Sequence, residues 1–315
     1  MRTRPIADIS PRDLRPLLDE EARHWGRELF WDFADVKNAV LGSLERRGLA
    51  GRVAQDGARV VAYGYYMADS TRAVVGSLFA TESHRGRGLE EALLDGILDE
   101  TQGLAGSDRV ECQTLFSTAP AADTRFAHLG FTGRRRHYLV RDLLGLLPRA
   151  PHVFKLRPFR RDDIGPAAQL IHRSHAGSLD AALNLTYATP ATCRGFVETL
   201  VLRSGCGRFD AEASLVADGG EGCLGVILAS QLSKLNGHIC QVSVAPQAQG
   251  RGLGTQLVLA GLEAMARRGL RSASLSVTVE NHRAYDLYLG LGFELRREFA
   301  AHAWARPPAR IEVPA

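Results

Sequence analysis

The sequence lacks several features that would assign it to a special class of protein. Its five cysteines are odd in number and show no C-x-x-C spacing, so neither a disulfide framework nor a zinc site is predicted. No apolar run reaches the roughly 18 residues of a membrane helix, and the N-terminus has no apolar core of a signal peptide. We therefore expect a cytoplasmic protein with no membrane partner and no metal.

Lysine is scarce, although basic residues are not. Only three of the 39 basic residues are lysines, and the arginines are scattered through both halves of the chain. The net charge of +4 is therefore weak evidence for a nucleic-acid partner, and we expect none. The apolar content of 45% supports sizeable cores, and 315 residues suit two domains of about 150 residues each.

The most informative segment is a glycine-rich loop between a strand pattern and a helix pattern. Its residues are Gln249, Gly250, Arg251, Gly252, Leu253, Gly254 and Thr255. Glycines let the backbone turn tightly, so that several N–H groups point the same way where a helix N-terminus adds partial positive charge. Such a loop binds phosphate. It is neither the dinucleotide fingerprint, which needs a further glycine, nor the P-loop, which needs a lysine.

A second motif follows this loop. After a predicted helix that ends at Gly269 and a β-type run at 273–279, residues 281–293 read NHRAYDLYLGLGF. The loop and this segment together resemble the Q/R-x-x-G-x-G/A and N-x-x-A-x-x-L-Y-x-x-x-G-F motifs of the GCN5-related N-acetyltransferase (GNAT) superfamily. The resemblance implies an α/β fold with a central, mostly antiparallel mixed sheet flanked by helices, and acetyl-CoA as the acetyl donor.

The pattern occurs twice. Residues 85–90 (RGRGLE) repeat the glycine loop, and residues 126–131 echo residues 288–293. We predict two tandem GNAT domains, residues 1–148 and 152–315, with a proline-containing boundary between them. In the second copy we expect strands at 153–156, 213–217, 222–230, 238–245 and 271–279, helices at about 162–174, 190–203, 253–268 and 281–290, and a closing pair of strands within 293–304.

The first copy departs from the motif where binding and chemistry need it. Glu90 stands at the final Gly/Ala position of the loop, and Phe126 stands where the motif has tyrosine. A carboxylate in the first helical turn complements the helix dipole but repels a pyrophosphate. We expect a degenerate first copy that packs against its neighbour or shapes its substrate cleft, and an active site in the second copy.

The resemblance implies how acetyl-CoA binds to the second copy. The backbone N–H groups from Gln249 to Thr255 are expected to hold the pyrophosphate, while the main chain around Val242 and Val244 pairs with the pantetheine arm like an added strand. Arg251 either helps at the rim or is a solvated loop side chain. Asn281 reaches the pantetheine amide, caps its helix, or does both.

Acetyl transfer to an amine needs a base, a donor to the developing oxyanion and an acid. An alkylamine with a pKa near 10.4 must lose a proton, at a cost of roughly 4 kcal/mol at neutral pH. We expect His238 as the base, a backbone N–H near Val242 as the oxyanion donor and Tyr288 as the acid. The alternatives are a surface histidine at a hairpin turn, with Gln241 or Ser243 holding a water in its place, and a tyrosine that only packs in the core.

The acceptor is expected over residues 175–193. Asp180 is the one acidic residue there, and Tyr187, His175 and Asn184 are polar options. This single carboxylate weakly favours an acceptor with a cationic amine. We therefore predict an N-acetyltransferase, an acyltransferase that moves an acetyl group from acetyl-CoA to a primary amine on a small molecule or a peptide. The alternative is a sensor that binds acyl-CoA without turnover, although the tyrosine of the second motif favours the enzyme.

Overall fold

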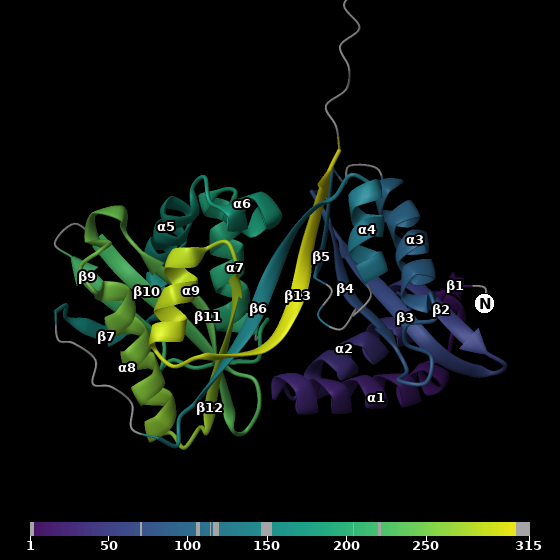
Figure 1. Cartoon of the computed structure of the whole chain (residues 1–315), viewed down its shortest axis with the longest axis horizontal. Coiled ribbons are helices and arrows are strands. Elements are labelled where there is room, and N and C mark those ends of the chain that lie inside the picture. Colours follow the sequence, from purple (N-terminus) through teal and green to yellow (C-terminus); the bar gives the residue numbers. More distant parts are fainter. Residues whose placement is uncertain are drawn as a thin grey trace, which may run out of the picture. The chain divides into compact units, whose positions relative to one another are not determined.

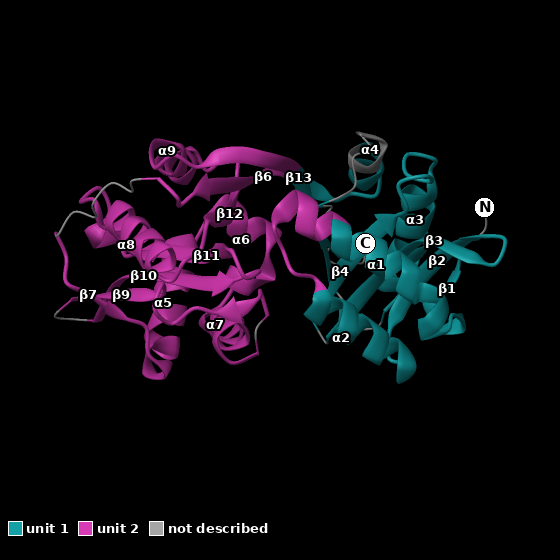
Figure 2. Ribbon diagram, turned by 90° about the horizontal axis from the view of Figure 1, so that it is seen from below, with its two compact units in different colours: residues 1–23, 34–134, 299–315 teal, residues 24–33, 135–298 magenta. Residues whose placement is uncertain are grey.

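The chain forms two compact units in a computed structural model (Figures 1 and 2). The structure describes residues 3–69, 71–104, 108–113, 115, 120–145, 153–203, 205–219 and 222–306. The first unit comprises residues 1–23, 34–134 and 299–315, and the second comprises residues 24–33 and 135–298. The two units therefore differ from the predicted domains, because residues 299–315 belong to the first unit and residues 24–33 belong to the second. The predicted boundary at 148–152 lies outside the described residues.

The first unit has the strand order β1-β2-β3-β4-β5-β13, antiparallel except for the parallel pair β4–β5. Helix α3 packs on β2, β3 and β4 through leucine and isoleucine side chains of one face. The elements are β1 (Thr3–Pro5), η1 (Ile6–Asp8), α1 (Pro11–Leu29), α2 (Ala34–Glu45), β2 (Ala50–Asp56), β3 (Arg59–Ala68), β4 (Ala73–Ala80), α3 (Leu89–Gln102), β5 (Arg109–Gln113), α4 (Pro120–His128), β6 (Thr132–Asp142) and β13 (Glu294–Ala305).

The second unit has the strand order β6-β12-β11-β10-β9-β7, with β8 beside β10, and only β11–β12 is parallel. This mixed, mostly antiparallel sheet confirms the predicted α/β class. The elements are β7 (Leu156–Pro158), η2 (Arg161–Asp163), α5 (Ile164–His175), α6 (Leu179–Leu183), η3 (Leu185–Tyr187), α7 (Pro190–Arg203), β8 (Arg208–Phe209), β9 (Leu215–Gly219), β10 (Gly222–Gln231), β11 (Asn236–Val244), η4 (Pro246–Ala248), α8 (Leu253–Arg267), β12 (Ser272–Thr278) and α9 (His282–Gly290).

Helices α5 and α8 both pack on β10 and β11. The residues of β10 from Gly225 to Ser230 are all buried, which requires cover on both faces of the strand. Small residues let α8 approach closely, because a Cβ added at Gly225 would lie 2.9 Å from Leu253 and one at Gly261 would lie 2.9 Å from Ile227. The close packing fixes the start of α8 against the sheet. No helix of the described residues is long and apolar enough to cross a membrane.

Strands β6 and β13 each contribute to both units. Although β6 belongs to the first copy by sequence, it pairs with β12 of the second unit, so that Arg136 lies opposite Thr278. Strand β13 ends beside β5 of the first unit, with Ala301 opposite Gln113. The predicted closing pair within 293–304 is therefore wrong. Residues 294–305 form one strand because no glycine or proline favours a turn in it, and the strand beside β12 comes from the first copy.

Candidate active site

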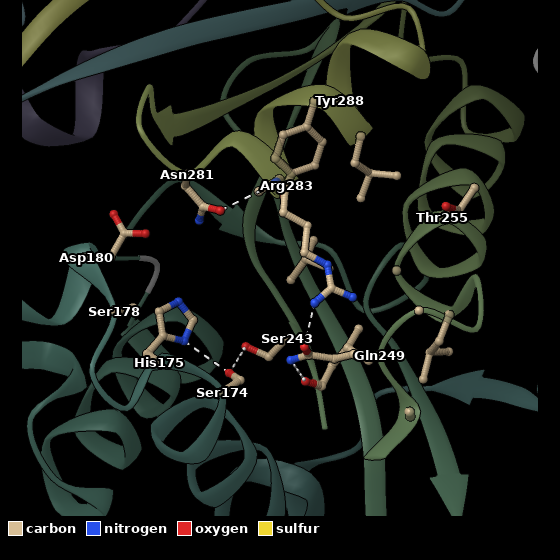
Figure 3. A pocket seen from close by; sticks show the side chains of 18 of the residues that line it. Ser174, His175, Ser178, Asp180, Ser243, Gln249, Thr255, Asn281, Arg283 and Tyr288 are labelled. Atoms are coloured by element: carbon tan, nitrogen blue, oxygen red, sulfur yellow. Dashed lines mark hydrogen bonds between the residues drawn. The ribbon is translucent and has the colours of Figure 1, made fainter. Parts of the chain in front are cut away.

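A cavity of about 620 Å³ lies in the second unit, at the C-terminal end of β11. Its walls come from the end of α5, the start of α6, the last residues of β11, the glycine loop with the first turn of α8, and α9. Figure 3 shows His175 and Asp180 on one side, Gln249 and Arg283 opposite them, and Tyr288 above. The cavity therefore joins the two sequence motifs to the segment predicted to hold the acceptor.

The last residues of β11 present to the cavity backbone N–H groups that no strand of the described residues pairs with. Strand β11 pairs with β12 only as far as Ile239, whereas it pairs with β10 as far as Val244. The Ala245 N–H donates to the Leu224 carbonyl in β10 at 2.8 Å. Because N–H groups alternate in direction along a strand, those of Val242 and Val244 point to the unpaired side. Both residues line the cavity, as an added strand would require.

The glycine loop forms an anion cradle. Gly250 and Gly252 have φ angles of +74° and +79°, and a Cβ added at either position would meet nothing within 4 Å. In the described part of the chain, the N–H groups of Gly250, Arg251 and Gly252 make no hydrogen bond. The first turn of α8, from Leu253 to Thr255, adds N–H groups without an intrahelical partner. The loop therefore fits a pyrophosphate such as that of acetyl-CoA.

The side chains beside the glycine loop include one arginine that lines the cavity, Arg283, and one that does not, Arg251. Gln249 donates from Nε2 to the Val244 carbonyl at 3.3 Å and accepts from Arg283 at 2.5 Å. Arg283 also lines the cavity, and it stands at a variable position of the second motif, so the motif alone does not predict a role for it. Arg251 does not line the cavity, because its guanidinium stacks 5.2 Å from the ring centroid of Phe154. A rim contact by Arg251 therefore has no support.

Helix α9 places Asn281 and Tyr288 in the wall of the cavity. Asn281 caps the helix, since its Oδ1 accepts from the Ala284 N–H at 3.4 Å. Tyr288 is 9% exposed, and its hydroxyl makes no hydrogen bond within the described residues. Burial, with smaller contributions from Asp180 and Tyr187, raises the pKa of Tyr288 well above its ordinary value. The phenol is therefore protonated at neutral pH and open to the cavity.

His175, the last residue of α5, lines the cavity with a defined tautomer. Its Nδ1 lies 3.0 Å from the Ile171 carbonyl, which can only accept, so Nδ1 carries the proton and Nε2 the lone pair. Burial lowers the pKa of His175, while Ile171 and Asp180 oppose the shift. Tyr187 does not line the cavity but stacks on this ring at 4.1 Å and donates to Gln241 at 3.2 Å. Tyr187 thus supports His175 from behind.

Asp180 lies at the same end of the cavity as His175. Its Oδ1 accepts from the Thr278 hydroxyl at 2.6 Å. Within the described residues, no cationic side chain lies within 4.0 Å of its carboxylate. The carboxylate is therefore positioned by a neutral hydrogen bond and keeps its charge available for a ligand.

His238 lies apart from the cavity. It is 7% exposed, its Nδ1 lies 3.0 Å from the Ser274 hydroxyl, and its ring stacks on Tyr138 at 6.0 Å. Burial, and to a smaller extent the Arg136 charge, lowers the pKa of His238 to about 4. The surface-histidine interpretation is wrong, because the preceding Asn-Gly pair belongs to β11 rather than to a turn. The base role has no support from this geometry.

Known proteins resemble this chain in sequence and in fold. Residues 191–293 match the Acetyltransferase (GNAT) family. The mycothiol acetyltransferase of Nocardioides sp. is 31% identical over 247 residues, which cover 69% of this chain and 75% of that protein. The mycothiol acetyltransferase of Tsukamurella paurometabola is 31% identical over 239 residues, which cover 70% of this chain and 75% of that protein.

Two solved structures share the fold over nearly the whole chain. A GCN5-related N-acetyltransferase from Sphaerobacter thermophilus superposes with a TM-score of 0.65 at 20% identity, covering 97% of this chain and 95% of that one. A tandem GNAT protein from the clavulanic acid biosynthesis pathway superposes with a TM-score of 0.62 at 17% identity, covering 98% and 99%. The predicted tandem arrangement is thereby confirmed.

Proposed function

This chain belongs to the GNAT family of acetyltransferases, and from that premise we propose that its second unit transfers an acetyl group from acetyl-CoA to a primary amine. One observation carries the proposal: a single cavity brings together the glycine loop, the end of β11, the protonated Tyr288 and the acceptor-side residues His175 and Asp180. Acetyl-CoA, when bound, supplies an acetyl group activated as a thioester.

The residues that would hold acetyl-CoA are backbone groups for the most part. The loop N–H groups and the helix N-terminus at Leu253 would bind the pyrophosphate, with the Thr255 hydroxyl as a further donor. Arg283 adds a cation at the cavity wall, already ordered by its bond to Gln249. The unpaired N–H of Val244 would donate to the pantetheine arm, which leaves the Val242 N–H for the acetyl oxygen.

The chain's own groups can move both protons of the reaction. An ammonium ion with a pKa near 10.4 gives up its proton at a cost of about 4 kcal/mol at neutral pH, and the lone pair on His175 Nε2 accepts it, directly or through water. The Val242 N–H stabilises negative charge on the acetyl oxygen. Tyr288 donates a proton to the departing sulfur, which a buried, protonated phenol can do at neutral pH.

The acceptor is proposed to be a small-molecule amine. Asp180 offers a carboxylate to an ammonium group, and two relatives that match about 70% of the chain are named mycothiol acetyltransferases. Amines related to mycothiol therefore belong in any acceptor panel. A protein N-terminus is the alternative within the same reaction class.

The proposal is tested by incubating the purified chain with acetyl-CoA and a panel of primary amines, while a thiol reagent follows release of free CoA. We expect release that depends on the amine, and a product heavier by one acetyl group in mass spectrometry. Tight binding of acetyl-CoA in calorimetry without thiol release from any amine would instead support an acyl-CoA sensor and overturn the enzyme assignment.

A further inference from the structure

Strand β6 brings a histidine from the first half of the sequence against helix α9 of the second unit. His137 lies in β6, which pairs with β12, and β12 leads into α9 (Figure 1). The Nδ1 of His137 lies 3.0 Å from the Tyr285 hydroxyl in α9, and the centroids of the two rings are 5.3 Å apart. His137 is 8% exposed, and a hydrogen bond is stronger where water is largely excluded. The histidine therefore makes a firm contact with the helix that also carries Tyr288.

A carboxylate on the other side of the ring sets the direction of this hydrogen bond. The Nε2 of His137 lies 3.1 Å from Oε2 of Glu298. The hydrogen bond from His137, together with the nearby Arg135 charge, lowers the pKa of Glu298, so its carboxylate is ionised at neutral pH and can only accept. Nε2 therefore carries a proton, and in the neutral ring Nδ1 accepts from the Tyr285 hydroxyl. Within the described residues that hydroxyl makes no other hydrogen bond.

Helix α9 has one buried side chain, that of Tyr288, and all nine of its residues are described. The start of the helix is held by the Asn281 N–H, which donates to the Thr278 carbonyl at 3.0 Å. Tyr285 precedes Tyr288 by three residues, and side chains at this spacing are neighbours on a helix surface. A rotation of α9 that broke the contact between Tyr285 and β6 would therefore also move the Tyr288 hydroxyl in the cavity.

We propose that His137 is a positioning residue of the active site: through Tyr285 it fixes the rotation of α9 and so holds the Tyr288 hydroxyl where it can protonate the departing sulfur. This inference rests on the proposed function. His137 does not line the cavity and acts only through the helix. Proton transfer needs its two heavy atoms within roughly 2.6–3.2 Å, so a small displacement of the hydroxyl lowers the rate. The first half of the chain thereby supplies, through β6, a part of the frame of the active site.

The test deletes the contact from each side and measures kcat with acetyl-CoA and the amine of the panel that releases CoA fastest. Tyr285→Phe and His137→Leu should each lower kcat by roughly 3- to 10-fold, the range of one neutral hydrogen bond, with little change in KM for acetyl-CoA. The double variant should be no slower than the slower single variant, because both changes delete the same interaction. His137→Asn should recover part of kcat, since its amide is attached to Cγ as Nδ1 is and can accept from the Tyr285 hydroxyl.

The decisive readout is the same pair of changes in a Tyr288→Phe background. A residue that acts through the Tyr288 hydroxyl has no effect once that hydroxyl is gone, so Tyr285→Phe and His137→Leu should not lower kcat further there. A contact that only stabilises the fold would lower kcat by the same factor in both backgrounds. Should His137→Leu fail to fold, as judged by circular dichroism, the two Tyr285→Phe measurements decide alone.

Arg135→Gln is the matched control. Arg135 lies on the same strand and pairs with the same Glu298, but its guanidinium is exposed and is not bonded to α9. This variant should keep the kcat of the wild type. A wild-type kcat in Tyr285→Phe, or an equal loss in the wild-type and Tyr288→Phe backgrounds, would overturn the inference and leave the proposed function intact. Acetyl-CoA binding without acetylation of any amine would overturn the proposed function, and the inference with it.

Discussion

The two glycine loops have nearly the same backbone conformation, but only the second is expected to bind an anion. Gly86 and Gly88 have φ angles of +72° and +77°, against +74° and +79° for Gly250 and Gly252, and a Cβ added at any of the four would meet nothing within 4 Å. Each loop opens into a helix whose first residue follows a left-handed glycine. Backbone shape alone therefore does not distinguish the two copies.

The second helical residue makes the difference. It is Gly254 in α8 and Glu90 in α3. Glu90 is 5% exposed, and its Oε2 has no hydrogen-bond partner within the described residues. Burial raises the pKa of Glu90, and the N–H groups of Glu90 itself and Gly86 oppose that shift. The first loop thus holds a buried carboxyl group of its own, so a single side chain can fill a phosphate site while the backbone of the loop is preserved.

The two copies also differ at the tyrosine position of the second motif, which holds Tyr288 in the second copy and Phe126 in the first. Substitution of this tyrosine is expected to have the largest effect on kcat. Tyr288→Phe keeps the ring but removes the proposed acid, so kcat should fall by roughly 10²–10⁴ with little change in KM for acetyl-CoA. The reverse change, Phe126→Tyr, should leave the rate unchanged, because Phe126 is fully buried and stacks on His302 at 3.9 Å. Single-turnover kinetics would expose an effect hidden by slow product release. Near-full single-turnover rates in Tyr288→Phe would exclude the hydroxyl as the acid.

His175 should produce the next largest effect. The neutral imidazole is the active form, and its pKa lies below the ordinary value of 6.5, so kcat/KM should fall as the pH drops through that lowered pKa. His175→Gln should lower kcat/KM by about 10² and abolish the fall of kcat/KM at low pH, which is the acidic limb of the pH profile. Asp180→Asn should move the limb to lower pH, because Asp180 raises the pKa of His175.

His238→Gln is the control for this prediction, since His238 lies outside the cavity. The fall of kcat/KM at low pH should be the same in His238→Gln as in the wild type, at pH values where the variant stays folded. A limb that disappears in His238→Gln and persists in His175→Gln would return the base role to His238.

Alanine at the left-handed glycine that precedes each helix should have an effect of intermediate size. Gly88→Ala and Gly252→Ala both force a Cβ into a left-handed conformation, at a cost of about 1–2 kcal/mol in the free energy of unfolding. Thermal denaturation should register similar losses for the two variants. Only Gly252→Ala should also weaken CoA binding in calorimetry, by an amount on the order of tenfold. Equal weakening by both variants would mean that both loops bind CoA.

Glu90→Gln should have the smallest effect, visible as a pH dependence of stability. The folded-state pKa of Glu90 is raised, so the folded protein holds this proton more tightly than the unfolded chain. The wild type should therefore be most stable relative to Glu90→Gln at low pH, and should lose that advantage as the pH rises through the raised pKa. Melting temperatures of the two proteins between pH 4 and 7 should diverge by a few degrees at most, as expected for about 1 kcal/mol. A difference that does not vary with pH would contradict the raised pKa of Glu90.

Local motifs predicted much of this molecule, because glycine spacing and hydrophobic periodicity are short-range signals. The loop, the helix at 253–268 and the strand at 271–279 lie within one residue of α8 and β12. The transfer of β6 into the second unit was not predictable in the same way, since strand pairing depends on contacts between segments distant in sequence. Without that pairing, nothing in the sequence places Arg136 opposite Thr278.

Two site residues were missed or misjudged for a related reason. The motif drew attention to His238 by its distance from the loop, yet the bend of β11 away from β12 begins only after Ile239 and leaves His238 in the paired part. His175 was noted only as a polar option near the acceptor. Its tautomer and its stacking on Tyr187 depend on how α5 ends against β11, which no local pattern predicts.

Calorimetric titration with CoA tests most directly the claim that the second loop is the acyl-CoA site and the first is closed by its own carboxylate. We predict one site per wild-type chain, abolished by Gly254→Glu and largely retained in Gly254→Gln, which adds similar bulk without charge. A Cβ at Gly254 makes only ordinary contacts at 3.7 Å, so both variants should fold. Two equivalent sites in the wild type, or undiminished binding in Gly254→Glu, would contradict the account.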